Sequence, residues 1–381
     1  MKSDILNKYH SYGLRVFGAC SESFRLPGFY CVIGLMSFFL VFAVCDCIAV
    51  SDDLDTLIND LITTLGILST ICNSLAFYSN RRKLELLIDE MYDDLVSKYA
   101  SDLSYAIMLT NTKTSRLLSN FILAMYSVMN MSFLLKAITS YLIGEVDERI
   151  FVCPSAFPWN GRKSPIYEIT ITCQFVMSSA VFYNLAIIEG QLAFLVLHAC
   201  SKVMIVKGEI AKLSQHADMN SVDQESLYAI IKKISQEHLG FLKFVKNLED
   251  VYSMVSLVHI LGLTLLLVVT GFTLIVATEK KAPMEAINYS VYLLSFLLNS
   301  GLYCYAGQHL NNQSETIATE ISNCPWYKFH VIHKKNINFM LMRAQIPVVL
   351  TAGKFNQLSF VLLTSMIKTS YSYLSIVRAS R

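Results

Sequence analysis

Seven apolar stretches, each close to the length of a membrane crossing, divide the 381-residue chain. A helix needs roughly 20 residues to cross about 30 Å of hydrocarbon. The stretches cover residues 28–48, 57–77, 117–143, 169–188, 255–277, 286–305 and 357–377. With 54% hydrophobic and 16% charged residues, the chain is more apolar than a typical soluble domain. The sequence therefore predicts an all-α membrane protein, a single domain over residues 1–381 with seven transmembrane helices in a lipid bilayer.

The distribution of lysine and arginine predicts the orientation of these helices. The N-terminal segment and every second connection together hold 22 of the 31 basic residues. Because cytoplasmic segments carry an excess of Lys and Arg, we expect a cytoplasmic N-terminus and an extracellular C-terminus. A net charge of only +2 gives no basic face for nucleic acid, so no nucleic-acid partner is expected.

Two connections on the predicted cytoplasmic side carry apolar residues at helical spacing. Residues 82–115 include Leu84, Leu87 and Ile88, and residues 201–251 repeat this spacing. Such patterns predict amphipathic helices. The fourth span is expected to continue through Glu189 and Gln191 into the cytosol without a break.

The last span has one polar side. Thr364, Lys368, Tyr371, Ser375 and Arg378 follow one another at steps of four, three, four and three residues. On a helix they form one narrow stripe, called the polar stripe below. Polar groups that face lipid are costly, so the stripe should face water or other protein. The sequence predicts a pore-lining helix over about residues 357–378.

The predicted outer halves of spans two, three, four and six are rich in aromatic and sulfur-containing side chains. Ordinary helix packing explains each of these residues taken singly. As a group they fit an apolar cavity with a few polar contacts, which is the usual form of a small-molecule site. The candidate ligand-binding residues are Phe133, Phe175, Ser179, Tyr183, Tyr289 and Tyr292.

No motif indicates catalysis or a bound cofactor. His330 and His333 have no Cys or carboxylate companions at metal-ligand spacing. The sequence contains neither a glycine-rich phosphate loop nor a Gly-x-Ser-x-Gly elbow. We therefore expect no enzyme activity, no metal and no cofactor.

Cys153 and Cys173 fall on the predicted outer side, where a disulfide bridge between them is possible. Two free thiols are the favoured interpretation, because the other cysteines form no disulfide framework. Asn288 begins a glycosylation sequon that adjoins the membrane.

Short motifs in the last third of the chain resemble one known family. They are residues 324–327 (CPWY), 345–347 (QIP), 350–355 (LTAGKF), 358–359 (LS) and 368–373 (KTSYSY). Their ordered spacing resembles insect odorant receptors of the ligand-tuning kind rather than the shared co-receptor.

The resemblance implies a fold and a function. Such proteins are seven-span subunits of ligand-gated, non-selective cation channels in the plasma membrane of olfactory neuron dendrites, and they form tetramers with a co-receptor. A small volatile odorant binds in the outer half, among spans two, three, four and six. Helices over about residues 201–250 and 307–356 form a cytoplasmic anchor, and the last span lines the pore.

The same resemblance places an outer gate near Leu374 and Arg378. Leu374 lies only about 60° from Tyr371 on the helical wheel, so it can face the pore. An Arg at the gate is a departure from the apolar gate of the co-receptor. Because a fourfold ring of Arg would oppose cations, the resemblance implies a mixed channel rather than a homotetramer.

Three alternative classes fit the sequence less well. A gustatory-type channel subunit shares the fold, but its usual Thr-Tyr…Gln-Phe ending is absent. A G-protein-coupled receptor would have the opposite charge bias, and its Asp-Arg-Tyr and Asn-Pro-x-x-Tyr signatures are missing. A transporter would show a repeat of broken helices.

Overall fold

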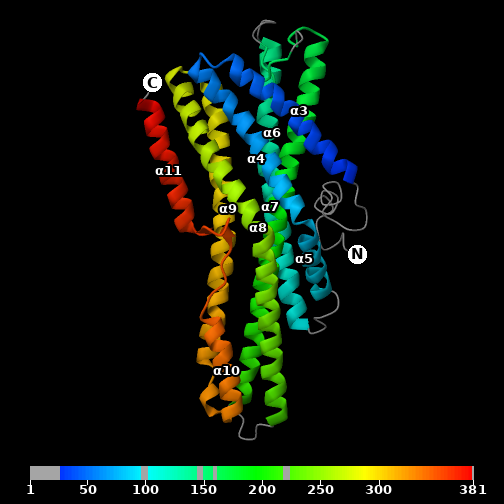
Figure 1. Cartoon of the computed structure of the whole chain (residues 1–381), viewed down its shortest axis with the longest axis vertical. Coiled ribbons are helices and arrows are strands. Elements are labelled where there is room, and N and C mark those ends of the chain that lie inside the picture. Colours follow the sequence, from blue (N-terminus) through cyan, green and yellow to red (C-terminus); the bar gives the residue numbers. More distant parts are fainter. Residues whose placement is uncertain (1–25, 96–101, 144–148, 158–160, 218–223, 380–381) are drawn as a thin grey trace.

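The structure is a computed structural model, and it describes residues 26–95, 102–143, 149–157, 161–217 and 224–379. Figure 1 shows an elongated molecule in which most long helices run along the longest axis. The last helix lies toward one end, called here the C-terminal end. The helix labelled α10 lies at the other end, called the α10 end.

Long helices make up most of the described chain. In order, the elements are α3 (Leu26–Ala49), α4 (Leu54–Ser79), α5 (Arg81–Asp93), α6 (Asp102–Ile143), α7 (Ile166–Ala217), α8 (Gln224–Glu279), α9 (Pro283–Asn323), η4 (Trp326–Lys328), α10 (Val331–Ala344), β1 (Thr351–Ala352), β2 (Asn356–Gln357) and α11 (Phe360–Ala379). The seven predicted spans fall on α3, α4, α6, α7, α8, α9 and α11, although α11 begins three residues later than its predicted span. The predicted all-α fold class is confirmed.

Five of the described helices, α3, α4, α6, α7 and α8, are long and apolar enough to cross a membrane. The other two predicted spans, α9 and α11, are 41 and 20 residues long. Polar residues such as Asn299 in α9 and Lys368 in α11 make these two helices less apolar. The chain is thus a helical membrane protein with several membrane-spanning segments.

Two helices, α4 and α9, begin at the C-terminal end of the molecule, and local sequence signals fix where each of them starts. Asp53 caps α4, because its carboxylate accepts from the backbone N–H of Asp55 at 3.2 Å and from the Thr56 hydroxyl at 2.5 Å. Pro283 stands in the first turn of α9, where its missing N–H costs nothing. Lys281 just before it has a positive φ of 54°, which turns the chain from α8 into α9.

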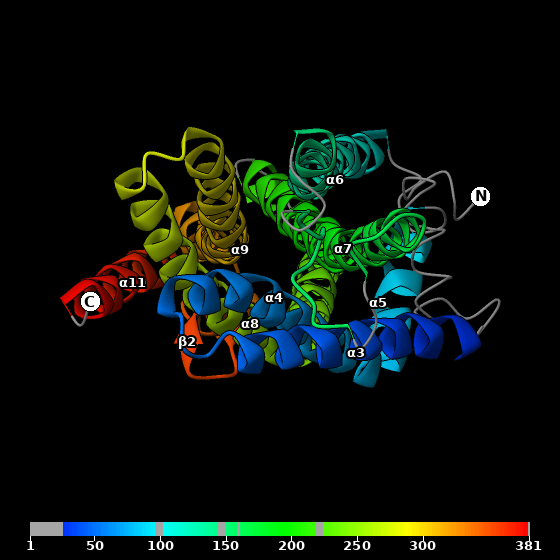
Figure 2. The same cartoon turned by 90° about the horizontal axis from the view of Figure 1, so that it is seen from above.

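The helices are arranged around α7. Of the five candidate spans α7 is the most buried and α3 the least. Figure 2 shows α3 and α11 at the periphery, with α7 and α8 between them. Peripheral apolar surface is stable in lipid, which explains why Tyr30 and Phe38 on α3 are exposed.

The predicted amphipathic helices beyond the spans are mostly extensions of the spans themselves. Helix α7 runs unbroken through Glu189 and Gln191 to Ala217, as predicted. Helix α8 is one helix of 56 residues, which joins the amphipathic segment to the fifth span. At the α10 end, buried residues such as Leu213 and Ile234 pack the extensions together.

A short hairpin precedes α11 and attaches it to α8 and α9. Strands β1 and β2 pair antiparallel, with Thr351 opposite Gln357. Gly353 has a positive φ of 63°, and its N–H donates to the Ser253 carbonyl of α8 at 2.8 Å. A Cβ added to Gly307 of α9 would lie 2.4 Å from the Leu358 carbonyl oxygen, so α9 and this segment touch backbone to backbone.

Cys153 and Cys173 are both free thiols, as the sequence favoured. The side-chain amide of Gln174 donates to the Cys153 carbonyl at 2.8 Å and accepts from the Cys153 N–H at 3.2 Å. Cys173 is about 100° away from Gln174 around α7 and is exposed. The amide therefore fixes the loop to α7 without a disulfide.

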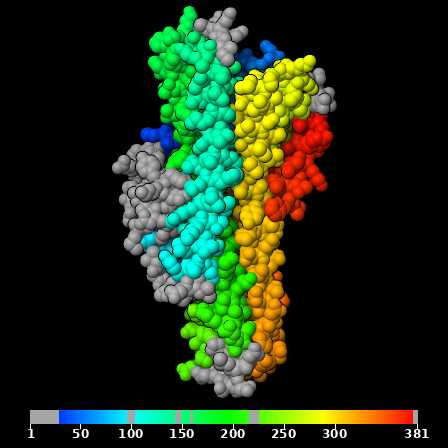
Figure 3. Space-filling view, turned by 180° about the vertical axis from the view of Figure 1, so that it is seen from behind, coloured from blue at the N-terminus to red at the C-terminus, as the bar shows by residue number. Residues whose placement is uncertain are grey.

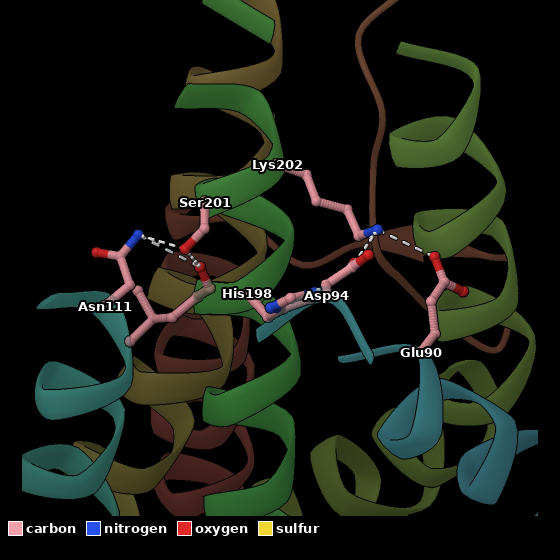
Figure 4. A network of polar contacts seen from close by, with 7 residues as sticks. Glu90, Asp94, Asn111, His198, Ser201 and Lys202 are labelled. Carbon is pink, nitrogen blue, oxygen red and sulfur yellow. Dashed lines mark hydrogen bonds and ion pairs between the residues drawn. The ribbon is translucent and has the colours of Figure 1, made fainter. Parts of the chain in front are cut away.

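A buried ion-pair cluster joins α5 to α7 (Figure 4). The Lys202 side chain is only 4% exposed; its Nζ lies 3.0 Å from Glu90 Oε1 and also contacts the Asp94 carboxylate. His198 Nε2 lies 3.2 Å from Asp94 Oδ2. Burial alone would raise the pKa of Asp94, but hydrogen bonding with His198 and the positive charge of Lys202 outweigh it and lower this pKa to about 2.

Candidate functional site

A cavity of about 80 Å³, called the main cavity below, lies among α4, α6, α7, α8 and α9. Its lining is mostly apolar, with Ile62, Met129, Phe182, Leu263 and Phe296 each contributed by a different helix. Apolar clefts with a few polar groups are typical of small-molecule sites. Because no single helix forms it, the cavity depends on the packing of the whole bundle.

The structure places three of the six candidate ligand residues at cavities. Phe133 lines the main cavity and also a second cavity of about 50 Å³, which Tyr289 and Tyr292 line as well. The Phe133 and Tyr292 rings stack with 4.7 Å between their centroids. Ring stacking thus joins α6 to α9 where the two cavities share Phe133.

The other three candidates, Phe175, Ser179 and Tyr183, line neither of these two cavities. Ser179 accepts a hydrogen bond from Asn130 Nδ2 at 2.7 Å and so joins α7 to α6. Its neighbour Ser178 does line the main cavity. The expected depth of a residue along its span therefore does not predict which face of α7 turns toward the cavity.

Sequence reasoning missed three polar residues of the main cavity, Asn73 on α4, Tyr126 on α6 and His259 on α8. All three are almost completely buried. Among the lining residues that each helix contributes, this one lies closest to the α10 end. The three residues together are called the polar end of the cavity. The signal was a polar residue within an apolar span, which in membrane proteins usually marks function.

Behind the polar end, a hydrogen-bond network joins three helices, and a stacked ring pair adds a fourth. The Tyr126 hydroxyl donates to Glu189 Oε1 of α7 at 2.5 Å. Asn299 of α9 donates through Nδ2 to the Tyr126 oxygen and, at 3.3 Å, to Glu189 Oε1. The His259 ring of α8 stacks on Tyr303 of α9, with centroids 4.2 Å apart. This network closes the cavity toward the α10 end.

A tight crossing joins α4 to α8 beside the cavity. A Cβ added to Gly262 would lie 2.2 Å from Ser69 Oγ, and Ser69 itself lines the cavity. Small residues such as glycine allow helices to approach closely in the membrane. The position of the α8 wall is therefore fixed by direct contact with α4.

Helix α11 presents the predicted polar stripe away from the rest of the chain. Met366 and Ser370 are buried against the bundle, whereas Thr364, Lys368 and Tyr371 are exposed. Figure 3 shows α11 protruding beside α9 at the edge of the molecule. The stripe therefore faces lipid or other protein, and lipid is unfavourable for a lysine.

Two further residues assigned to the pore differ from one another. Ser375 is exposed with the stripe. Leu374 is half-buried and packs against Gly271 of α8, where a Cβ would lie 3.3 Å from the leucine. The side chain of Arg378 lies outside the part of the chain whose side chains the structure describes.

A family model described as 7tm odorant receptor matches residues 53–371. This match covers most of the chain, and the cavity, the polar end and the part of α11 up to Tyr371 lie within it. The fold and the family together define a membrane receptor and not an enzyme. The protein belongs to the odorant receptor family.

Individual relatives and solved structures agree with this assignment. Odorant receptor 13a of Drosophila melanogaster is 25% identical over 235 residues, which are 58% of this chain and 56% of that protein. Odorant receptor 22c of the same species is 20% identical over 219 residues, 56% of this chain and 54% of that protein. The matched part of the chain thus spans about half the length of these relatives.

The whole fold is similar to that of the insect olfactory receptor OR5 from Machilis hrabei. Its structure in complex with eugenol gives a TM-score of 0.79 at 14% identity and covers 100% of both chains. Another structure of that receptor gives 0.75 at 15% identity, with 97% of this chain and 96% of the other covered. At such low identity the similarity shows the fold alone.

Proposed function

We propose that the protein is the odorant-binding subunit of a heteromeric, ligand-gated, non-selective cation channel. A small volatile binds in the main cavity, and α11 lines the pore. The observation that carries the proposal is the presence, in one chain, of an apolar cavity between helices and of an exposed polar stripe on a peripheral helix. The first suits an apolar ligand and the second suits a wet pore.

Helix α8 provides a physical connection between the two. It lines the cavity with His259, Leu263 and Leu266. Its Thr264 carbonyl accepts a hydrogen bond from Ser370 of α11 at 3.4 Å. A ligand that favours one position of α8 therefore also favours one position of α11.

The charge on α11 supports a heteromeric tetramer with co-receptor subunits. Lys368 is exposed on the polar stripe, and Arg378 follows on the same face in sequence. Four copies would place rings of positive charge around the pore, and such rings repel cations. Co-receptor subunits lower this charge and so permit cation flow.

The proposed location is the plasma membrane of an olfactory neuron dendrite, with the N-terminus inside and the C-terminus outside. In this orientation the α10 end is the cytoplasmic anchor, formed from about residues 201–250 and 307–356. An epitope tag at the C-terminus should stain intact cells, whereas a tag at the N-terminus should stain only permeabilised cells. The reverse pattern would overturn this orientation.

The function is tested by expressing the chain with an insect odorant receptor co-receptor and applying a panel of volatiles. At least one volatile should evoke a current carried by both sodium and potassium. The chain alone should give no current, and the co-receptor alone should not respond to the same volatile. Surface-expressed complexes that answer no volatile would contradict the proposal.

A further inference from the structure

Asn73 is an unpartnered amide that faces the main cavity. Its side chain is 1% exposed and lines the cavity. Neither its Oδ1 nor its Nδ2 has a hydrogen-bond partner among the described residues. Buried polar groups are nearly always hydrogen-bonded, because an unmade bond forfeits solvation without compensation. An amide in this state indicates that a ligand atom completes it.

The neighbouring polar side chains on α4 do not satisfy this amide, because they have partners of their own. The Thr70 hydroxyl donates to the Gly66 carbonyl at 2.8 Å. The Ser74 hydroxyl donates to the Thr70 carbonyl at 2.6 Å and accepts from the Asn184 amide. Asn73 therefore has no partner within this stretch of α4, and its amide remains available to the cavity.

His259 is a second buried group at the polar end with an unused nitrogen. It is 4% exposed, and its Nε2 has no hydrogen-bond partner among the described residues. Glu189 Oε1 lies 3.7 Å from this nitrogen, which is too long for a hydrogen bond. The polar end thus offers unused hydrogen-bonding groups from two helices, α4 and α8.

The rest of the lining excludes a charged ligand. None of the residues that line the main cavity is Asp, Glu, Lys or Arg. A buried charge without a counter-charge is strongly unfavourable. The nearby carboxylate of Glu189 accepts from Tyr126 and Asn299 and does not line the main cavity.

We infer that the ligand is an uncharged, largely apolar molecule with one hydroxyl group, which hydrogen-bonds to the Asn73 amide at the polar end of the cavity. An amide has both a donor and an acceptor. A hydroxyl can accept from Nδ2 and donate to Oδ1, whereas an ether or a carbonyl can only accept. An alkane satisfies neither atom. The expected order of potency is therefore alcohol, then ether, then alkane. This inference rests on the proposed odorant-gated function.

The test compares matched triads of volatiles on cells that express the chain with its co-receptor. Each triad is an alcohol, its methyl ether and the alkane of similar length, with linear, cyclic or aromatic skeletons, and a primary amine is added to each. In the most active triad the alcohol should be at least about tenfold more potent than the alkane, since one hydrogen bond contributes about that factor. Equal potency of alcohol and alkane, or a preference for the amine, would overturn the inference.

Substitution then assigns the preference to Asn73. Asn73→Leu keeps the approximate size of the side chain but removes both polar atoms. It should lower the ratio of alcohol to alkane potency about tenfold, with the alkane response retained. The control is Thr170→Val on α7, which does not line the main cavity and whose hydroxyl donates to the Ile166 carbonyl of its own helix at 2.8 Å; this variant should leave the ratio unchanged. An unchanged ratio in Asn73→Leu would overturn the proposed hydrogen bond between the ligand and Asn73.

Failure of the inference can be distinguished from failure of the proposed function. Robust responses that do not depend on the hydroxyl leave the channel function standing and reject only the ligand class. If no compound evokes a response although both subunits reach the surface, the proposed function fails, and the inference fails with it. The triads on the unsubstituted chain remain decisive even if Asn73→Leu does not fold.

Discussion

The carboxylate of Glu249 accepts a hydrogen bond from the backbone N–H of Thr351, with 2.9 Å between nitrogen and oxygen. The Thr351 hydroxyl donates to the same carboxylate. Thr351 begins the hairpin that leads into α11, and Glu249 lies on α8 less than three turns before His259. The helix that lines the cavity is thus bonded directly to the segment that positions α11.

Loss of this bond should weaken the coupling between cavity and pore. We expect Glu249→Ala to reduce the maximal odorant-evoked current several-fold while the order of ligand potencies stays unchanged. Hydrogen bonds to a charged group contribute about 1.5–3 kcal/mol. The control is Asp250→Ala, which removes only an exposed pair with Lys83 at 3.4 Å. Equal currents from both variants would disprove the coupling role.

The close contact between α9 and the chain before α11 should be sensitive to a single methyl group. In Gly307→Ala the new Cβ would overlap the Leu358 backbone. We expect a loss of stability of about 1–3 kcal/mol, because the backbone must shift. Gly301→Ala on the same helix meets nothing within 4 Å and should stabilise by up to about 1 kcal/mol. Thermal unfolding of the solubilised protein measures both, and similar midpoints would contradict the contact.

The network behind the polar end should contribute to stability. Tyr126→Phe removes the hydroxyl that joins Glu189 to Asn299 and leaves buried polar atoms without a partner. The expected cost is about 1–3 kcal/mol. Tyr105→Phe changes an exposed tyrosine of the same helix and should have little effect. A Tyr126→Phe protein as stable as the unsubstituted chain would show that the network is not stabilising.

The ion-pair cluster at Lys202 predicts an acid-dependent loss of stability. The folded pKa of Asp94, about 2, lies below an unfolded value of about 3.9. A lowered carboxylate pKa stabilises the fold above about pH 4, and this contribution of about 2 kcal/mol is lost as pH falls toward 2. Unfolding midpoints measured across this range should decrease accordingly.

Replacement of Lys202 should lower the stability of the fold already at neutral pH. Lys202→Met leaves two carboxylates without their cation, at a cost of about 3–5 kcal/mol, and moves the acid transition to higher pH. Lys207→Met on the same helix removes only a partly exposed pair with Glu320 and should cost less than about 1 kcal/mol. Identical pH profiles for both variants would argue against the cluster.

The presence of the helices was predicted from the sequence more accurately than their lengths. Hydropathy is a local property, so residues 28–48 correctly indicated α3 (Leu26–Ala49). Residues 201–251 and 255–277 have different patterns and were treated as separate elements, although residues 224–279 form one helix. Helix hydrogen bonds do not depend on hydropathy, and no proline interrupts residues 224–279. The hairpin at Thr351 was not predicted, because two-residue strands show no periodicity.

The cavity was predicted less well for a physical reason. In a membrane, the faces that contact lipid and the faces that contact protein are both apolar, so composition does not show which face turns inward. Phe133, chosen by depth, lines the main cavity, whereas Phe175 lines neither of the two cavities. Asn73 and His259 were missed although each is polar within an apolar segment. Rare polar residues within spans would have been the better guide.

The most direct test of the account is cysteine substitution along α11, with a charged thiol reagent applied from outside during an odorant-evoked current. If α11 lines the pore, the reagent should block the current of variants with cysteine in place of Tyr371, Ser375 or Arg378. The current of variants with cysteine in place of Tyr373 or Ile376 should not change. Leu374 packs against α8 in this structure, so its cysteine should react more slowly than the one at Ser375. Block that follows this helical periodicity is the predicted result. Block at every position alike, or at none, would contradict a pore along the polar stripe.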